Sequence, residues 1–188
     1  MISTLGYALL GLIAREPTTG YDLARQLRRP VGYFWSARHS QIYPELARLE
    51  GAALLRHVVI DGAGPRPTKQ YSITGTGRRE VRSWLLSTSA DVDEREVLLR
   101  AYLLFVLTPD EAAGVMRAIR SHHVQVLDHY LLIGSGAEPQ VWGPAATERA
   151  TLDWGVAFER GRITWCDGLL AHLEGWRRDD HPSPRGRP

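Results

Sequence analysis

Apolar residues recur every three or four positions along the first fifty residues, the spacing that places them on one face of a helix. This pattern predicts a first helix over residues 5–14, ended by Glu16-Pro17. It predicts a second helix from Tyr21 to about Arg29, amphipathic and short. Two helices joined by a tight connection are therefore expected at the start of the chain.

A third helical stripe follows an aromatic loop, on Ile42, Leu46, Leu49 and Ala53. Pro44 lies within this stripe and has no N–H to donate, so it is tolerated only near the start of a helix. We therefore expect His39 or Ser40, rather than Ser36, to cap the third helix.

The pattern then changes to that of strands. Residues 55–60 are rich in β-branched side chains, residues 61–65 form a Gly-rich turn, and residues 68–73 alternate in polarity. A fourth helix is predicted from about Gly77 to Leu86. Helix, helix, helix, hairpin and helix is the order of a winged helix-turn-helix, which we assign to residues 1–88.

The second half of the chain shows helical spacing alone. It predicts a helix over residues 94–107, another from Pro109 to Ile133 with Thr108 as its cap, and a long last helix from Ala145 to about Arg178. We assign residues 90–180 to an all-helical domain and expect residues 181–188 to be a disordered tail. The predicted fold class is mainly α with a small β-hairpin.

Charge divides the chain at the same place. Residues 1–89 contain 12 basic and 6 acidic residues, a net charge of +6, whereas residues 90–188 contain 11 and 15, a net charge of −4. A basic winged helix is suited to a polyanion such as double-stranded DNA.

Several classes of protein are disfavoured. The single cysteine, Cys166, excludes an internal disulfide, and the longest apolar run, residues 101–107, is too short to cross a membrane. The chain has no phosphate loop, nucleophile elbow or metalloprotease motif, so we expect no enzyme and no cofactor. We also expect no metal site, because nothing in the sequence brings Cys166 together with His122, His123, His129 and His172.

Residues near the start of the third helix are the candidates for reading DNA. A helix that enters the major groove by its N-terminus presents free N–H groups to phosphate, while Arg and Gln hydrogen-bond base edges. The groove candidates are Arg38, His39, Ser40, Gln41 and Tyr43. On the hairpin, Arg66 and Lys69 can follow the phosphate backbone or enter the minor groove.

Motifs over residues 1–87 resemble the PadR family of bacterial winged-helix transcriptional regulators. The segment Thr19-Gly20-Tyr21-Asp22-Leu23 is similar to the family's opening of the second helix. Residues 41–50, QIYPELARLE, resemble its recognition-helix signature, and residues 69–74, KQYSIT, resemble its wing strand. The chain departs from the family at Ala53, where glycine is usual, and this affects the expected ending of the third helix.

The resemblance implies a cytoplasmic bacterial homodimer, on the nucleoid when bound to DNA. Its two winged helices would bind a palindromic operator and usually repress transcription, with C-terminal helices forming the dimer. Dimerisation also follows from physics, because one winged helix reads only a few base pairs. The competing interpretation is a winged-helix module that binds a protein or carries a ligand without binding DNA.

The last helix contains an aromatic stripe that includes Trp154, Phe158 and Trp165. Two interpretations stay open. The stripe can line a pocket for a small aromatic effector, or it can form the core or the dimer seam, which is the commoner use of aromatic residues at helical spacing.

Overall fold

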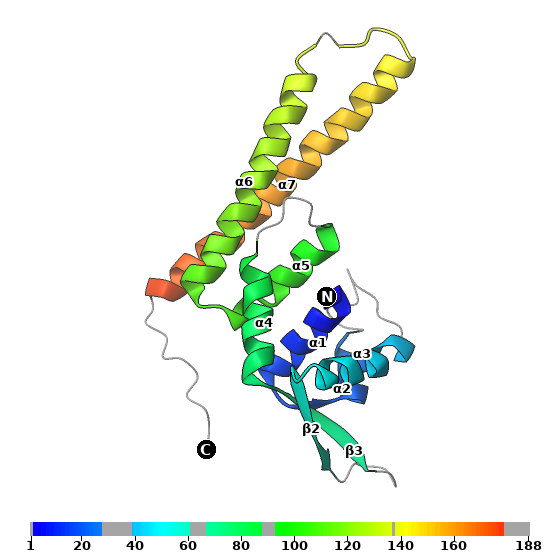
Figure 1. Ribbon diagram of the computed structural model, residues 1–188. Coiled ribbons are helices and arrows are strands. Elements are labelled where there is room, and N and C mark those ends of the chain that lie inside the picture. Colours follow the sequence, from blue (N-terminus) through cyan, green and yellow to red (C-terminus); the bar gives the residue numbers. More distant parts are fainter. Residues whose placement is uncertain (1, 28–38, 61–66, 88–92, 137, 179–188) are drawn as a thin grey trace. The chain divides into compact units, whose positions relative to one another are not determined.

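The computed structural model describes residues 2–27, 39–60, 67–87, 93–136 and 138–178 (Figure 1). The chain forms two compact units, Met1–Leu107 and Thr108–Pro188. The first unit contains helices and a small sheet, and the described part of the second is helical. The predicted residues 28–29, the hairpin turn at 61–65 and the tail at 181–188 lie outside the described residues.

The elements of the first unit follow in the predicted order, with one short strand added. They are α1 (Thr4–Arg15), β1 (Thr18–Thr19), α2 (Gly20–Gln26), α3 (His39–Gly51), β2 (Leu55–Ile60), β3 (Thr68–Ile73), α4 (Gly75–Leu86), α5 (Glu94–Tyr102) and the 3-10 helix η2 (Leu104–Val106).

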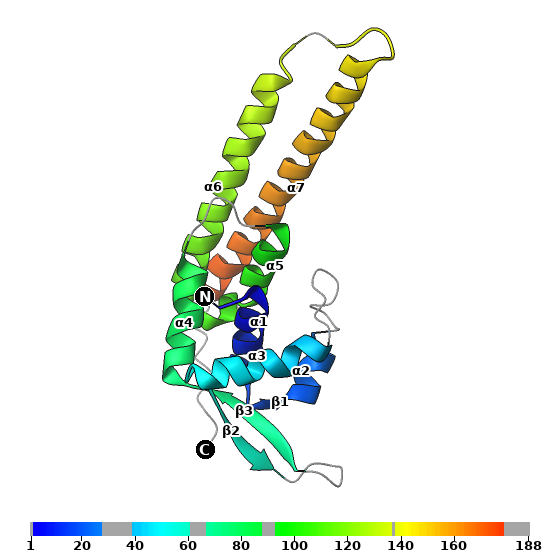
Figure 2. The ribbon, with the colours of Figure 1, turned by 45° about the vertical axis from the view of Figure 1, so that its right-hand side comes forward.

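Helix α1 forms the centre of the first core. Its side chains Leu9, Leu10, Leu12 and Ile13 are at most 2% exposed. The helix contacts α3, α4 and β3 (Figure 2). Burying one such aliphatic side chain stabilises the fold by about 1.5–3 kcal/mol. The long apolar stretch at the N-terminus is therefore a core helix, as predicted.

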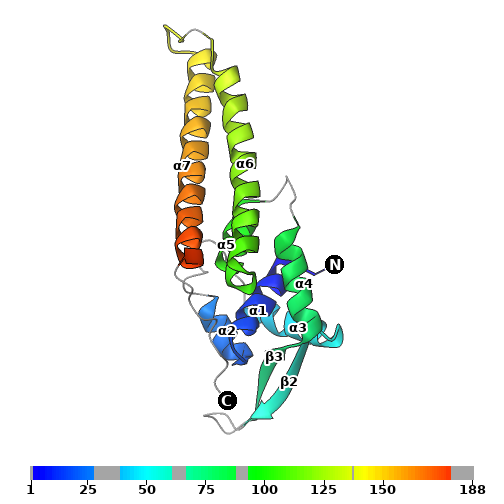
Figure 3. The same cartoon turned by 90° about the vertical axis from the view of Figure 1, so that its left-hand side faces the viewer.

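The sheet is antiparallel, with strand order β1-β3-β2. Strands β2 and β3 pair from Leu55 opposite Ile73 to Ile60 opposite Thr68, and their hairpin projects from the helices of its unit (Figure 3). Both strands have the predicted bounds. Strand β1 adds Thr18 opposite Tyr71, which the sequence analysis did not predict.

Helix α3 begins earlier than its predicted cap. His39 and Ser40 already belong to the helix, so neither is the residue before it. Pro44 consequently lies in the second turn and removes one backbone hydrogen bond, the one that its N–H would donate to the carbonyl of Ser40. Burial of Ile42, Leu46 and Leu49, each at most 1% exposed, offsets that loss.

The turn that follows helix α3 contains a residue with left-handed backbone. Ala53 has φ 57°, and the N–H of Leu54 donates to the carbonyl of Leu49 while that of Ala53 donates to Glu50. These two bonds form a Schellman motif, whose left-handed position is usually glycine. The alanine keeps the ending that the family pattern implies, at the cost of backbone strain.

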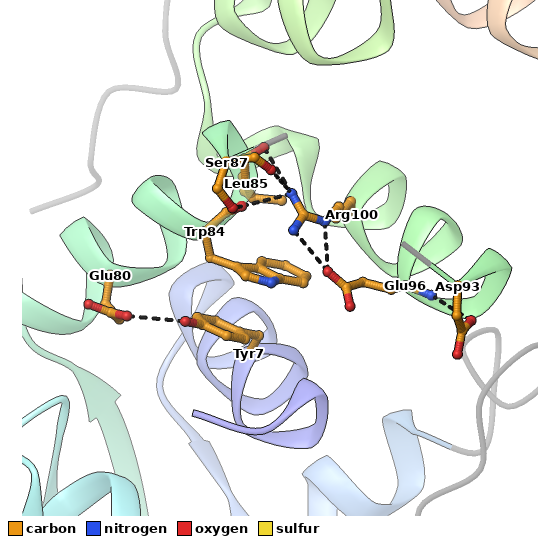
Figure 4. Close-up of polar contacts among 8 residues, drawn as sticks. All are labelled: Tyr7, Glu80, Trp84, Leu85, Ser87, Asp93, Glu96 and Arg100. Carbon is orange, nitrogen blue, oxygen red and sulfur yellow. Dashed lines mark hydrogen bonds and ion pairs between the residues drawn. The ribbon is translucent and has the colours of Figure 1, made fainter. Parts of the chain in front are cut away.

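A buried arginine extends the first unit beyond the predicted boundary near residue 89. The guanidinium of Arg100 donates to the carbonyls of Trp84 and Ser87 at 2.8 and 2.6 Å and to Glu96 (Figure 4). It lies 4.5 Å from the ring centre of Trp84, which in turn stacks on Tyr7 at 4.4 Å. These contacts hold α5 against α4 and α1, so the compact unit continues to Leu107.

Helix α5 stops at Tyr102 rather than at the predicted residue 107, and the chain continues as η2. Leu103, the residue after α5, is fully buried, and its side chain lies where a Cβ on Gly11 of α1 would collide with it. Helix α5 thus ends within the apolar run of residues 101–107, and Leu103 of that run packs on α1.

The second unit is a hairpin of two long helices, α6 (Pro109–Ile133) and α7 (Pro144–Arg178) (Figure 1). Thr108 and Glu111 form the predicted capping box of α6. Between the helices, the buried side chains of His123 and Glu159 pair at 2.7 Å. None of the helices in the described ranges is long and apolar enough to cross a membrane.

Candidate nucleic-acid interface

Helix α3 presents a polar and small face to solvent because its apolar stripe is buried. Ser40, Gln41 and Tyr43 are exposed, as a groove-reading face requires. Pro44 and Ala47 are exposed on the same helix. Their side chains have no hydrogen-bonding groups, so the sequence alone does not select these two residues as candidate DNA contacts.

The ring of Tyr43 is held by a close approach between α2 and α3. A Cβ on Gly20 would lie 2.7 Å from Cε1 of that ring, so only glycine leaves the space that the ring occupies. The side chain nevertheless remains 46% exposed. Gly20 therefore positions a tyrosine at the surface beside the N-terminus of α2.

The other two tyrosines of the family-like motifs differ from each other. Tyr71 is only 5% exposed, and burial is the main cause that raises its pKa, with a further contribution from Glu50. Tyr21 is 66% exposed on α2. Tyr71 is thus a core residue of the sheet, whereas Tyr21 is available at the surface.

The carboxylates of α3 contact basic side chains, and the charge of Arg48 reduces the repulsion of phosphate by Glu45. Glu45 accepts hydrogen bonds from Arg48 at 2.6 Å and from the hydroxyl of Ser3, also at 2.6 Å. The hydrogen bond from Arg48 is the main cause that lowers the pKa of Glu45. Glu50 contacts the imidazole of His57 on β2.

Lys69 stands on the exposed side of the hairpin, opposite Val59. It has no ion-pair partner within the described ranges. Val58 and Val59 are 56% and 63% exposed, which is unusual for aliphatic strand residues. Their place in a strand is predicted from the sequence, but their exposure is not. Arg38 and Arg66 lie outside the described residues, and only the backbone of His39 is described.

The three residues named for the aromatic stripe of α7 lie in different surroundings. Trp154 is 65% exposed and stacks on Phe158 with ring centres 4.9 Å apart, and the Arg162 guanidinium lies 4.1 Å from the centre of Phe158. Trp165 is 39% exposed, further along the helix. A cavity of about 730 Å³ at the loop end of the hairpin is lined by Trp154 but by neither Phe158 nor Trp165.

The described residues of this unit offer no metal-binding group. Within the described ranges, no group of three or more His, Cys, Asp or Glu side chains could hold a metal ion. Cys166 is fully buried, and burial raises the pKa of its thiol to about 11, which keeps the thiol protonated and unreactive.

Two family models match this chain. The transcriptional regulator PadR-like family matches residues 9–83, and the family described as virulence activator alpha C-term matches residues 95–174. The first match covers the helices and hairpin that carry the candidate interface.

Two curated relatives match over nearly their whole length. The negative transcriptional regulator PadR of Bacillus subtilis is 27% identical over 177 residues, covering 90% of this chain and 97% of the relative. The "Probable transcriptional regulator Rv1176c" of Mycobacterium tuberculosis is 29% identical over 186 residues, with the same coverage.

Among solved structures, B. subtilis PadR in complex with operator DNA is 26% identical, covers 91% of this chain and 99% of that chain, and has a TM-score of 0.46. The family matches and the curated relatives agree on one class of protein, which is regulatory and not enzymatic. Over residues 9–83, this chain is similar to the PadR-like family of transcriptional regulators, and both curated relatives are named as transcriptional regulators.

Proposed function

We propose that this chain is a sequence-specific DNA-binding repressor that acts as a homodimer on a palindromic operator. The observation that carries the proposal is the exposed face of α3, on which Gln41 and Tyr43 face solvent while Glu45 is paired with Arg48. Repression is supported by the name of the B. subtilis relative, a negative transcriptional regulator. Such a protein works in the bacterial cytoplasm, on the nucleoid when bound.

The proposal divides the contacts between two roles. Gln41 and Ser40 contact base edges in the major groove, together with Arg38 and His39, because these side chains can hydrogen-bond bases. Tyr43, Lys69 and Arg66 contact the phosphate backbone and set the position of the protein. The fixed ring of Tyr43 suits this second role, since it loses little side-chain entropy on binding.

Helix α7 supports the homodimer. Gly161, Gly168 and Gly175 repeat every seven residues on its exposed surface, and a Cβ on any of them would meet nothing within 4 Å. Each glycine in a helix interior costs about 1 kcal/mol relative to alanine. Close approach of a second helix explains why these positions lack side chains.

An antiparallel copy of α7, related by a two-fold axis near residue 166, is the arrangement we propose. It places Thr164 of one copy opposite Gly168 of the other and brings Arg160 near Glu174, a pair of opposite charge. Trp165 then covers the edge of the seam. This assigns Phe158 and Trp165 to the dimer and leaves Trp154 to the cavity.

The test is fluorescence anisotropy with DNA from upstream of the protein's own gene and with scrambled DNA, each at two salt concentrations. We expect binding to the upstream DNA to be at least a hundredfold tighter. Equal, weak and salt-sensitive binding to both DNAs, with sedimentation showing a monomer at micromolar concentration, would contradict the proposal and favour a protein-interaction module.

A further inference from the structure

The second unit has a cavity at the end of its helical hairpin, where α6 and α7 are joined by the loop over residues 134–143 (Figure 1). Its volume of about 730 Å³ lies in the range of sites for small organic molecules. Tyr130 and Ile133 come from α6, and Glu148, Arg149 and Trp154 come from α7. The cavity belongs to this unit alone and lies outside the proposed DNA interface.

Gly155 leaves room for one of the aromatic rings that line this cavity. A Cβ on Gly155 would lie 3.0 Å from Cε2 of Tyr130, so the glycine lets the tyrosine ring lie against the backbone of α7. The neighbouring Trp154 is 65% exposed although it is the largest side chain in the lining. Two aromatic rings therefore border a space large enough for a bulky ligand.

The positive charge of the lining is already satisfied. The guanidinium of Arg149 contacts Glu138 at 2.7 Å and Asp153 at 2.9 Å, and it donates to the carbonyl of Gly134 at 3.1 Å. One guanidinium thus faces two carboxylates and a carbonyl. It has little capacity left for an anionic ligand.

The remaining polar groups are mainly acceptors. The hydroxyls of Thr147 and Thr151 donate to the carbonyls of Pro144 and Thr147. Glu148 is exposed in the lining and pairs with no cation in the described part of the chain. Glu148 is the carboxylate of the lining, and Glu138 and Asp153, which lie beside the lining, compensate the charge of Arg149.

We propose that this cavity binds a bulky aromatic cation. Trp154 and Tyr130 bring aromatic rings to the lining, and π faces attract a cation. Arg149 is compensated by Glu138 and Asp153, so the carboxylate of Glu148 favours cations over anions. The site gives a small-molecule effector of this regulator a place distinct from α3. Binding of the cation in this cavity does not depend on operator binding.

The test uses two probes of equal shape and opposite charge, tetraphenylphosphonium and tetraphenylborate, titrated into the full chain without DNA by isothermal calorimetry. We expect the cation to bind at least tenfold more tightly than the anion. Trp154→Ala should weaken cation binding at least tenfold, and Glu148→Gln about threefold. Trp154→Leu keeps apolar volume but removes the π face, and it should reduce the preference for the cation.

Matched controls lie in the same unit. Trp176 on α7, 62% exposed, and Asp128 on α6, also exposed, are outside the cavity, so Trp176→Ala and Asp128→Asn should leave cation binding unchanged. Equal binding of both probes, or equal losses in the control variants, would overturn the inference. Circular dichroism confirms that each variant is folded, and failure here would leave the proposed operator binding untouched because no DNA is present.

Discussion

The two units use tryptophan in opposite ways. In the first unit, Trp84 lies between the ring of Tyr7 and the guanidinium of Arg100, and its surroundings complete the packing of α1, α4 and α5. In the second, Trp142, Trp154 and Trp176 are 86%, 65% and 62% exposed. Trp84 is thus packed by partners of its own unit, whereas these three tryptophans of the second unit are exposed and available to a partner or a ligand. Variants that disturb each unit should therefore fail in different assays.

Removal of Arg100 is expected to have the largest effect on stability. Arg100→Met keeps much of the apolar stem but leaves Glu96 and the carbonyls at the end of α4 without their donor. We expect the free energy of unfolding to fall by about 3 kcal/mol. Urea denaturation measures it, with Arg95→Met, an exposed change on the same helix, as the control. Equal effects of both changes would refute the structural role of Arg100.

A side chain at Gly168 should disrupt the proposed contact between two copies of α7 and leave the fold of the second unit intact. Gly168→Leu should raise the dimer dissociation constant about a hundredfold, because the new side chain separates the two copies of α7. Gly114→Leu is the matched control, since Gly114 is also exposed in a long helix with nothing within 4 Å of its Cβ position. Leucine favours helix over glycine at both sites, so neither variant should lose helicity.

Sedimentation equilibrium separates these outcomes. If both variants stay dimeric, the seam proposed on α7 is wrong, although another dimer interface and operator binding would remain open. If both become monomeric, the glycine at residue 168 has no special position.

Within the proposed DNA interface, the residues assigned to bases and those assigned to phosphates should respond differently to substitution. Gln41→Ala should weaken binding to the preferred operator by about 1–3 kcal/mol and change base preference. Lys69→Ala should weaken binding to all sequences and reduce the salt slope by about one. Anisotropy titrations on a set of operator variants measure both. Equal losses on every sequence for both changes would contradict the division of roles.

Features that are local in the sequence could be predicted from it. Strands β2 and β3 were predicted with their observed bounds, because a β-branched run and an alternating run flank a Gly-rich turn. Strand β1 was missed because two residues, Thr18 and Thr19, have no period to detect. Long α6 was predicted from Pro109 to Ile133, since its capping box is local in sequence.

Features that depend on distant partners were not predicted. The helix over residues 94–107 was expected to be continuous, but it ends where Leu103 packs on α1. For the candidate interface, polarity selected Ser40, Gln41 and Tyr43, but it could not select Ala47 or show that Tyr71 is buried. Arg149, which lines the cavity beside Trp154, contacts Glu138 and Gly134, and no local spacing indicates these contacts.

The smallest expected effect concerns the one described non-glycine residue with positive φ, Ala53. Left-handed backbone costs an alanine about 1–2 kcal/mol, and glycine relieves it while adding flexibility to the unfolded chain. Ala53→Gly should therefore raise the free energy of unfolding of the first unit by about 1 kcal/mol, measured by urea denaturation. Ala52→Gly, one residue earlier with no positive φ, should lower it. If both changes lower the free energy of unfolding equally, contacts around Ala53 already compensate for the strain of its left-handed backbone.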